Sequence, residues 1–252
     1  MSKQYVTGLV SVSFRSSSPE QILSAMSEAG LTHIEWGSDI HAPFNDRARL
    51  TELARLQSEL GISCSSYGTY FRLGETPIEL LENYVDAAET LGTRILRLWC
   101  GTKSGADMTE GERAALLLEC ERAEEIARKR GATFCFECHR RTFTERIEDT
   151  YALMKKVNSP HIRTYWQPFE WLSVEENRES ARARAPFCEH IHVFNWRGSE
   201  KLPLSEAIDT WRGYLSEFSG PRTLLLEFMP DGKLSTLAQE AEALRKIIEG
   251  AR

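Results

Sequence analysis

The sequence has no long apolar segment. No run of apolar residues approaches the roughly 18 that a membrane-spanning helix needs, and residues 1–5 lack the charged-then-apolar pattern of a signal peptide. We therefore expect a cytoplasmic protein with no membrane partner.

Positive charge is not in excess. The chain has 31 Lys and Arg residues against 37 Asp and Glu residues, which gives a formal net charge of −6 at pH 7. A protein that binds nucleic acid usually presents a concentrated basic face. We therefore expect no nucleic-acid partner.

The cysteines do not form the pattern of a disulfide framework. Most of the six fall in predicted strands and helices, as expected of small buried residues in a reducing compartment. Cys135, Cys138 and His139 match the Cys-x-x-Cys-His signature of haem attachment. Residues three apart in a strand point to opposite faces, so the two sulfurs should diverge and bind no haem.

Helix ends recur at regular intervals. Gly30, Gly61 and Gly92 each follow a helical pattern at a spacing of 31 residues, and Gly131 repeats the arrangement after a longer unit. Glycine just past a helix end adopts the left-handed conformation without steric cost. Capping boxes are predicted at the start of four helices. They begin at Ser18, Thr76, Thr109 and Ser173.

Eight strand patterns alternate with eight helical patterns. The strands are predicted at residues 7–14, 32–37, 62–67, 94–99, 132–138, 162–166, 188–195 and 223–228. Such alternation implies a parallel sheet, and eight units in about 250 residues is the size of a closed (β/α)8 TIM barrel. An open doubly wound sheet usually has fewer units, and no Gly-x-Gly-x-x-Gly turn follows the first strand. We predict a single α/β domain over residues 1–252.

Polar side chains stand late in each of the last four predicted strands. They are Glu137, Gln167, His192 and Glu227. The carboxyl ends of barrel strands form the active site, and neighbouring strands lie ~4.8 Å apart, so the four side chains can converge on one ion. Two carboxylates, an imidazole and an amide oxygen suit Mn²⁺, Mg²⁺ or Co²⁺, with Zn²⁺ as an alternative. The carboxylates can instead be structural partners of Arg15, Arg97 or Arg140, and Gln167 can serve as a simple hydrogen-bonding amide.

The whole chain resembles the xylose isomerase-like barrel family. The resemblance rests on Glu137 in Phe-Cys-Phe-Glu-Cys-His-Arg, His192 in His-Ile-His-Val-Phe-Asn and Glu227 in Leu-Glu-Phe. The segments at residues 8–15 and 34–37 are similar to its sugar phosphate isomerase/epimerase group. The resemblance implies that these three residues bind a divalent metal. The family's fourth ligand is usually an aspartate, and Gln167 stands at the matching position.

The resemblance also implies a reaction. A divalent cation polarises a substrate carbonyl, and Glu137 and Glu227 act as base and acid to move a proton between neighbouring carbons through an enediolate. The expected substrate is a sugar or sugar phosphate, and the expected activity is that of an isomerase or epimerase. The alternatives are an inosose-type dehydratase and a polyol-binding barrel that has lost its metal.

Further side chains near the predicted strand ends are candidates for substrate contact. They are Arg15, His41, Arg72, Trp99, His139 and Trp196. The basic ones can bind a phosphate or a carboxylate, and aromatic faces pack against sugar C–H groups or simply close the barrel. We expect Tyr70 and Phe71 to be exposed in a loop, which favours a homodimer.

Overall fold

The computed structural model describes residues 5–251 and shows a closed barrel of parallel strands. The barrel strands are β1 (Tyr5–Val10), β2 (His33–Gly37), β3 (Ser63–Arg72), β4 (Ile95–Trp99), β5 (Thr133–Glu137), β6 (Ile162–Trp166), β7 (Cys188–Val193) and β10 (Arg222–Leu226). They are paired in the order β1-β10-β7-β6-β5-β4-β3-β2 and close on β1. The (β/α)8 prediction is confirmed.

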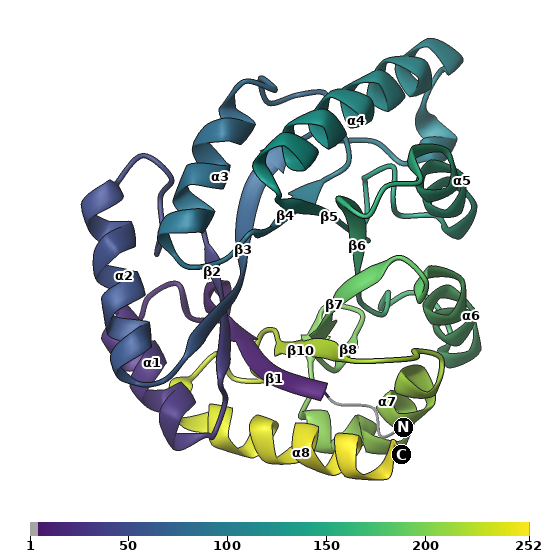
Figure 1. Ribbon diagram of the computed structural model, residues 1–252. Helices are drawn as coiled ribbons and strands as arrows, with labels where there is room; N and C mark the ends of the chain where they lie inside the picture. Colours follow the sequence, from purple (N-terminus) through teal and green to yellow (C-terminus); the bar gives the residue numbers. More distant parts are fainter. Residues whose placement is uncertain (1–4, 252) are drawn as a thin grey trace.

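One helix follows each barrel strand and packs on the outside of the sheet (Figure 1). The helices are α1 (Pro19–Glu28), α2 (Arg47–Glu59), α3 (Leu80–Thr90), α4 (Glu110–Arg130), α5 (Ile147–Val157), α6 (Val174–Arg184), α7 (Ile208–Ser216) and α8 (Leu237–Gly250). Short 3-10 turns lie at Ser11–Phe14, Gly105–Asp107, Leu204–Ala207 and Leu234–Thr236, and a small hairpin of β8 (Trp196–Arg197) and β9 (Glu200–Lys201) follows β7. Within residues 5–251, no helix has the length and apolarity to cross a bilayer.

The predicted helix ends are largely confirmed. All four glycines have positive φ, from 61° at Gly131 to 87° at Gly92. Reciprocal capping boxes are present at Ser18, Thr109 and Ser173. The fourth prediction is wrong: α3 begins only at Leu80, and the Thr76 hydroxyl accepts a hydrogen bond from the Arg72 amide at 3.1 Å instead.

Two apolar layers hold the barrel together. The larger one fills the space between the strands and the helices, with Trp36, Trp166 and Trp211 among its largest buried side chains. The smaller one lies separately and comprises Val10, Val12, Cys135, Tyr165 and Leu225. Cys135 and Cys138 belong to different surroundings, and all six cysteines are free and buried.

Strand β3 is longer than predicted. It runs to Arg72, so Tyr70 and Phe71 belong to a strand and not to a loop. Phe71 is fully buried and Tyr70 packs edge-on against Trp99. The reason for expecting a homodimer is therefore wrong, because these rings are not exposed loop aromatics.

Candidate active site

The last four barrel strands bring four donor side chains together. Glu137 ends β5, His192 lies in β7, and Gln167 and Glu227 directly follow β6 and β10. The Nδ1 atom of His192 lies 3.0 Å from Gln167 Oε1, 3.2 Å from Glu227 Oε2 and 3.6 Å from Glu137 Oε1. One ligand atom from each of Glu137, His192 and Glu227 lies within 4.8 Å of the other two. The four predicted residues thus lie together, with the side-chain oxygens of Gln167, Glu227 and Glu137 around the Nδ1 atom of His192.

Two donors hold the other carboxylate oxygen of Glu137. The Trp99 indole donates to Glu137 Oε2 at 2.5 Å, and the Arg97 guanidinium donates to the same atom through Nη1. Both residues come from the neighbouring strand β4. Glu137 Oε2 is therefore occupied, and Oε1 is the oxygen that faces His192.

Arg97 also binds a second buried carboxylate, Glu35 of β2. Arg97 Nε lies 3.0 Å from Glu35 Oε1, and the Ser66 hydroxyl donates to Glu35 Oε2 at 2.9 Å. Gly68 pairs with Arg97 in the sheet and leaves room for this ion pair, because a Cβ there would lie 2.7 Å from Glu35 Oε1. A buried charge is tolerated only when it is paired and hydrogen-bonded in this way.

The charged side chains in this cluster strongly shift one another's pKa values. Burial alone would raise the pKa of Glu35, but Arg97 and His192 lower it to about 2. The same two partners outweigh burial at Glu137 and hold its pKa well below the ordinary value. Burial alone would lower the pKa of His192, whereas Glu227, Glu137 and Glu35 raise it well above the ordinary value. The carboxylates Glu35 and Glu137 are therefore ionised at neutral pH.

The donor set fits a divalent cation. When His192 is neutral, three carboxylates, those of Glu35, Glu137 and Glu227, face one permanent cation, Arg97. Two of the three negative charges are then uncompensated. His192 Nε2 is buried, has no hydrogen-bond partner within residues 5–251 and lies 3.7 Å from Glu35 Oε1. If Nδ1 binds a cation, the proton must sit on Nε2 and face this carboxylate, which is the usual arrangement behind a metal-binding histidine.

The backbone beside Glu227 is strained. Phe228 has φ of 58°, a left-handed conformation that a bulky residue rarely adopts. Its amide donates to the Ser13 hydroxyl at 2.9 Å, so this hydrogen bond joins the segment after the last barrel strand, β10, to the segment after the first, β1. Strain of this kind persists only where the surroundings enforce it, and it is common at functional sites. This contact fixes the direction in which the chain leaves Glu227.

The other predicted contact residues lie mostly around the mouth of the barrel. Arg72 stacks on Trp99, with Cζ 3.9 Å from the ring centroid, and the His139 ring lies 5.4 Å from the same indole. Arg15 binds Asp39 at 2.8 Å and the Tyr70 hydroxyl at 2.5 Å. On the opposite rim, Trp196 packs on Phe228 at 5.5 Å.

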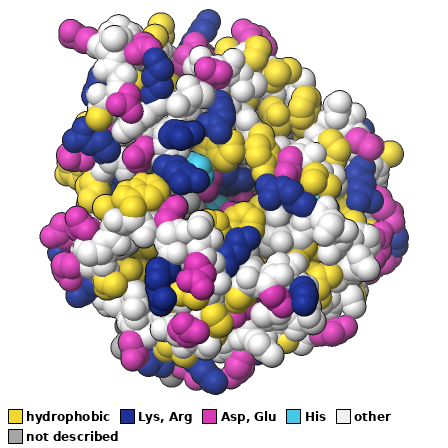
Figure 2. All heavy atoms as spheres, turned by 180° about the vertical axis from the view of Figure 1, so that it is seen from behind, with side chains coloured by type: hydrophobic (Ala, Val, Ile, Leu, Met, Phe, Trp, Pro, Cys, Tyr) yellow, Lys and Arg dark blue, Asp and Glu magenta, His cyan; other side chains and the backbone are white. Residues whose placement is uncertain are grey.

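A cavity of about 140 Å³ opens at this mouth. Its lining includes Glu137, Gln167, Glu227, His139 and Trp196. Figure 2 shows this face of the molecule, on which Lys and Arg side chains gather around a central hollow and histidine is visible within it. The hollow thus combines a carboxylate floor with a rim rich in cations and aromatic rings.

His41 is not brought to this mouth. It is 1% exposed, its Nδ1 contacts the Ser11 hydroxyl at 3.1 Å, and its Nε2 contacts the Ser17 carbonyl at 3.3 Å. Its ring packs edge-on against Trp36. The structure therefore places His41 as a buried, hydrogen-bonded residue of the loop after β2, and it does not line the cavity at the mouth.

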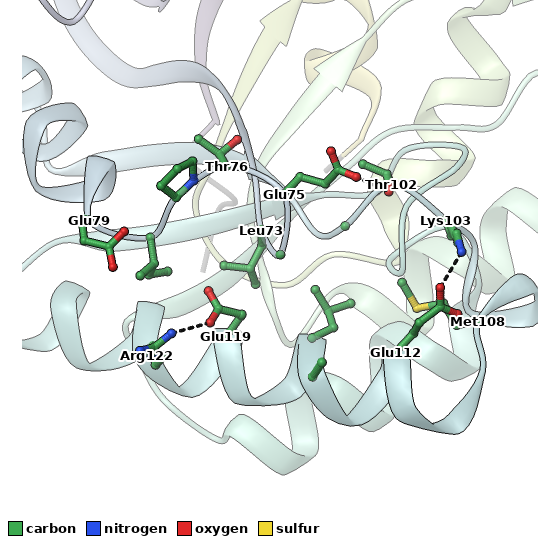
Figure 3. A pocket seen from close by; sticks show the side chains of 16 residues that line it. Leu73, Glu75, Thr76, Glu79, Thr102, Lys103, Met108, Glu112, Glu119 and Arg122 are labelled. Carbon is green, nitrogen blue, oxygen red and sulfur yellow. Dashed lines mark hydrogen bonds and ion pairs between the residues drawn. The ribbon is translucent and has the colours of Figure 1, made fainter.

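A second, more voluminous cavity lies outside the barrel mouth (Figure 3). It measures about 600 Å³ and lies between residues 73–79, residues 101–103 and helix α4. Two of its carboxylates, Glu112 and Glu119, are already paired with Lys103 and Arg122. Within residues 5–251, the cluster of His, Cys, Asp and Glu with metal-ligand spacing is the one at the strand ends, so we place the chemistry there.

The sequence reasoning named Arg97 as a possible partner of the strand-end carboxylates, and its pair with Glu137 confirms this, but it missed Glu35 as the second buried partner of Arg97. The signal was present: each is a charged residue inside an apolar strand, in Ile-Leu-Arg-Leu-Trp and Ile-Glu-Trp. Such residues need a partner of opposite charge when buried. The strand pattern does not say which carboxylate faces which arginine, because the partners come from β2, β4 and β5.

Residues 23–247 match the family described as xylose isomerase-like TIM barrel. The chain belongs to this family. No curated protein sequence matches the chain.

Solved structures show the same fold at low sequence identity. The probable 3-DHS dehydratase AsbF of Bacillus anthracis is 17% identical, with a TM-score of 0.79 over 96% of this chain and 99% of that one. An L-ribulose 3-epimerase is 16% identical, with a TM-score of 0.70 over 100% and 96%. A xylose isomerase-like protein of Mycobacterium smegmatis in complex with magnesium is 14% identical, with a TM-score of 0.68 over 99% and 98%.

Proposed function

We propose that this barrel is a divalent-metal-dependent enzyme that moves a proton next to a carbonyl group, as an isomerase or epimerase of a sugar or a related hydroxy-carbonyl compound. The observation that carries the proposal is the convergence of three oxygens on His192 Nδ1, in a cluster that has two uncompensated negative charges when His192 is neutral. Membership of a family whose solved neighbours include epimerases supports it.

Glu137, Gln167, His192 and Glu227 would hold the cation. Carboxylate, amide and imidazole donors suit Mn²⁺, Mg²⁺, Co²⁺ or Zn²⁺. When bound, the cation supplies Lewis-acid polarisation of the substrate carbonyl and its neighbouring hydroxyl. Glu35 would orient His192 through Nε2, and the Arg97–Trp99 pair would keep Glu137 Oε1 turned toward the site.

Glu227 and Glu137 move the proton in this proposal. One carboxylate removes the proton from the carbon beside the carbonyl, and the proton returns to the neighbouring carbon or to the opposite face. Both carboxylates line the cavity and face His192, and Glu137 is in addition anchored through Oε2 by two donors. Trp196 and Phe228 pack on each other and line the cavity together with Glu227.

The first test is metal content. We would purify the protein without chelator and compare it by elemental analysis with a His192→Ala, Glu137→Gln double variant. The control is His161→Ala, because His161 contacts the Ala132 carbonyl away from the cluster. We expect about one equivalent of metal in the parent and control and none in the double variant. Absence of metal from the parent after incubation with Mn²⁺ refutes the proposal and favours a binding-only barrel.

The second test is proton exchange. We would incubate ketoses, their phosphates and hydroxy-keto acids with the enzyme in D2O and follow deuterium incorporation next to the carbonyl by NMR. Glu227→Gln should abolish incorporation without unfolding the protein. A product that has lost water identifies a dehydratase built on the same first step. Undiminished incorporation in Glu227→Gln contradicts the two-carboxylate mechanism.

A further inference from the structure

Arg72, at the end of β3, is a cation without a carboxylate partner. Its guanidinium has no ion pair or hydrogen bond among residues 5–251, and its contact is with the face of Trp99 at 3.9 Å. Burial lowers the pKa of Arg72, and the nearby charges of Glu75 and Glu137 oppose this without reaching ion-pair distance. Arg72 is partly exposed, so a ligand can reach its guanidinium.

The other arginines named at the mouth each have a carboxylate within ion-pair distance. Arg15 pairs with Asp39 at 2.8 Å, Arg97 pairs with Glu35 and Glu137, and Arg140 lies 3.8 Å from Glu170. Arg72 is therefore the arginine of this group that has no carboxylate within ion-pair distance among residues 5–251.

The side chain of Trp99 links Arg72 to the catalytic cluster. The indole whose face carries the Arg72 guanidinium donates its N–H to Glu137 Oε2 at 2.5 Å. A guanidinium stacked on an aromatic face keeps its planar fork free for two parallel hydrogen bonds to a carboxylate or phosphate. Stacking also fixes the orientation of the fork before the ligand arrives, which reduces the entropy lost on binding.

We propose that the substrate carries an anionic group, a carboxylate or a phosphate, and that Arg72 binds this group while the carbonyl end lies between Glu137 and Glu227. The inference rests on the proposed function, because Arg72 is linked through Trp99 to Glu137, one of the two proposed proton-moving residues. It goes beyond that function by excluding neutral sugars as the preferred substrates and by assigning a specificity-determining residue.

The test uses ligands that cannot be enolised, so binding is measured without turnover. We would titrate the protein calorimetrically with ribitol, ribonate and ribitol 5-phosphate, which share a five-carbon polyol chain and differ in charge, with and without Mn²⁺. A charge-assisted contact predicts that at least one anion binds roughly tenfold or more tightly than ribitol. The tighter anion tells whether the group is a carboxylate or a phosphate.

Three variants assign the effect. Arg72→Gln should lose the preference for the anion, and Arg72→Lys should keep part of it because the charge remains without the fork. Arg55→Gln is the control and should keep the preference, because Arg55 forms an exposed pair with Glu52 on helix α2. Thermal unfolding checks that each variant is folded.

The outcomes separate this inference from the proposed function. Binding of ribitol as tight as that of both anions, or no binding of either anion, overturns the inference. The inference is also overturned if Lys201→Gln loses the preference for the anion and Arg72→Gln keeps it, because Lys201 lies on the opposite rim, 4.7 Å from the Phe228 centroid. An anion preference that depends on Arg72, in a protein without metal or proton exchange, supports the anion site and rejects the proposed enzyme. Proton exchange that occurs only with neutral sugars supports the proposed enzyme and rejects the anion site.

Discussion

Replacing Glu35 by glutamine removes one charge from the centre of the barrel with almost no change in shape. Glu35 is fully buried and pairs with Arg97 at 3.0 Å, and Ser66 donates to its second oxygen. In Glu35→Gln, the buried Arg97 guanidinium keeps only Glu137 as its carboxylate partner. Removing one partner of a buried pair leaves an undercompensated charge in a medium of low dielectric constant, so the folded state should be destabilised.

The pKa gives the size and the pH dependence of this effect. The pKa of Glu35 falls from 4.5 to about 2 on folding, and this difference corresponds to about 3 kcal/mol of stability. Because the folded pKa lies below the unfolded one, the contribution is fully present above about pH 4.5 and is lost as the pH falls toward 2. Glu35→Gln should therefore lower the free energy of unfolding by about 3 kcal/mol at pH 7, and the difference from the parent should shrink between pH 5 and pH 3.

The assay is urea unfolding of parent and variant, followed by circular dichroism at several pH values. Glu52→Gln is the control, because Glu52 forms an exposed pair with Arg55 on helix α2 and its loss should matter far less. Equal effects of the two substitutions at pH 7 would refute our account of the buried pair. A difference for Glu35→Gln that stays constant down to pH 3 would show that packing, and not ionisation, carries its contribution.

Three further perturbations test the surroundings of the site. Gly68→Ala places a Cβ 2.7 Å from Glu35 Oε1, so we expect a loss of roughly 1–3 kcal/mol in unfolding free energy, and a neutral result would contradict the tight fit. Trp99→Phe removes the indole N–H from Glu137, so calorimetry should show Mn²⁺ affinity reduced roughly tenfold, and unchanged affinity would deny Trp99 a positioning role. Thr109→Ala removes the cap of helix α4, so urea unfolding should show a loss of roughly 0.5–2 kcal/mol with activity unchanged, and a loss of activity would link α4 to the site.

Local signals in the sequence determined the architecture. The glycines after α1, α2, α3 and α4 and three of the four predicted capping boxes mark helix ends as the structure shows them. These signals are reliable because caps depend on side chains within three or four residues of the helix end. Counting the units then leads to the closed barrel, and barrel geometry places Glu137, Gln167, His192 and Glu227 at one end of it.

Errors arose where longer-range contacts override local pattern. The Thr76-Pro77-Ile78-Glu79 segment has the composition of a capping box, but Thr76 binds the end of β3 and the helix starts later. Strand β3 continues to Arg72 because β4 pairs with it there, opposite Trp99. Neither contact is visible in the segment itself.

The partners of the charged residues were decided by the tertiary structure alone. The strand pattern shows that Glu35, Arg97 and Glu137 lie in apolar strands. The chain contains several residues of opposite charge that could pair with each of them. Closure of the barrel brings β2, β4 and β5 around one interior, and the missing side chain of Gly68 leaves the space in which Arg97 meets both carboxylates. The sequence by itself determined which elements form and which polar residues stand at the carboxyl ends of the last four barrel strands. The tertiary structure decided how the site is charged, because an ion pair depends on the distance between atoms that the chain brings together only when it folds.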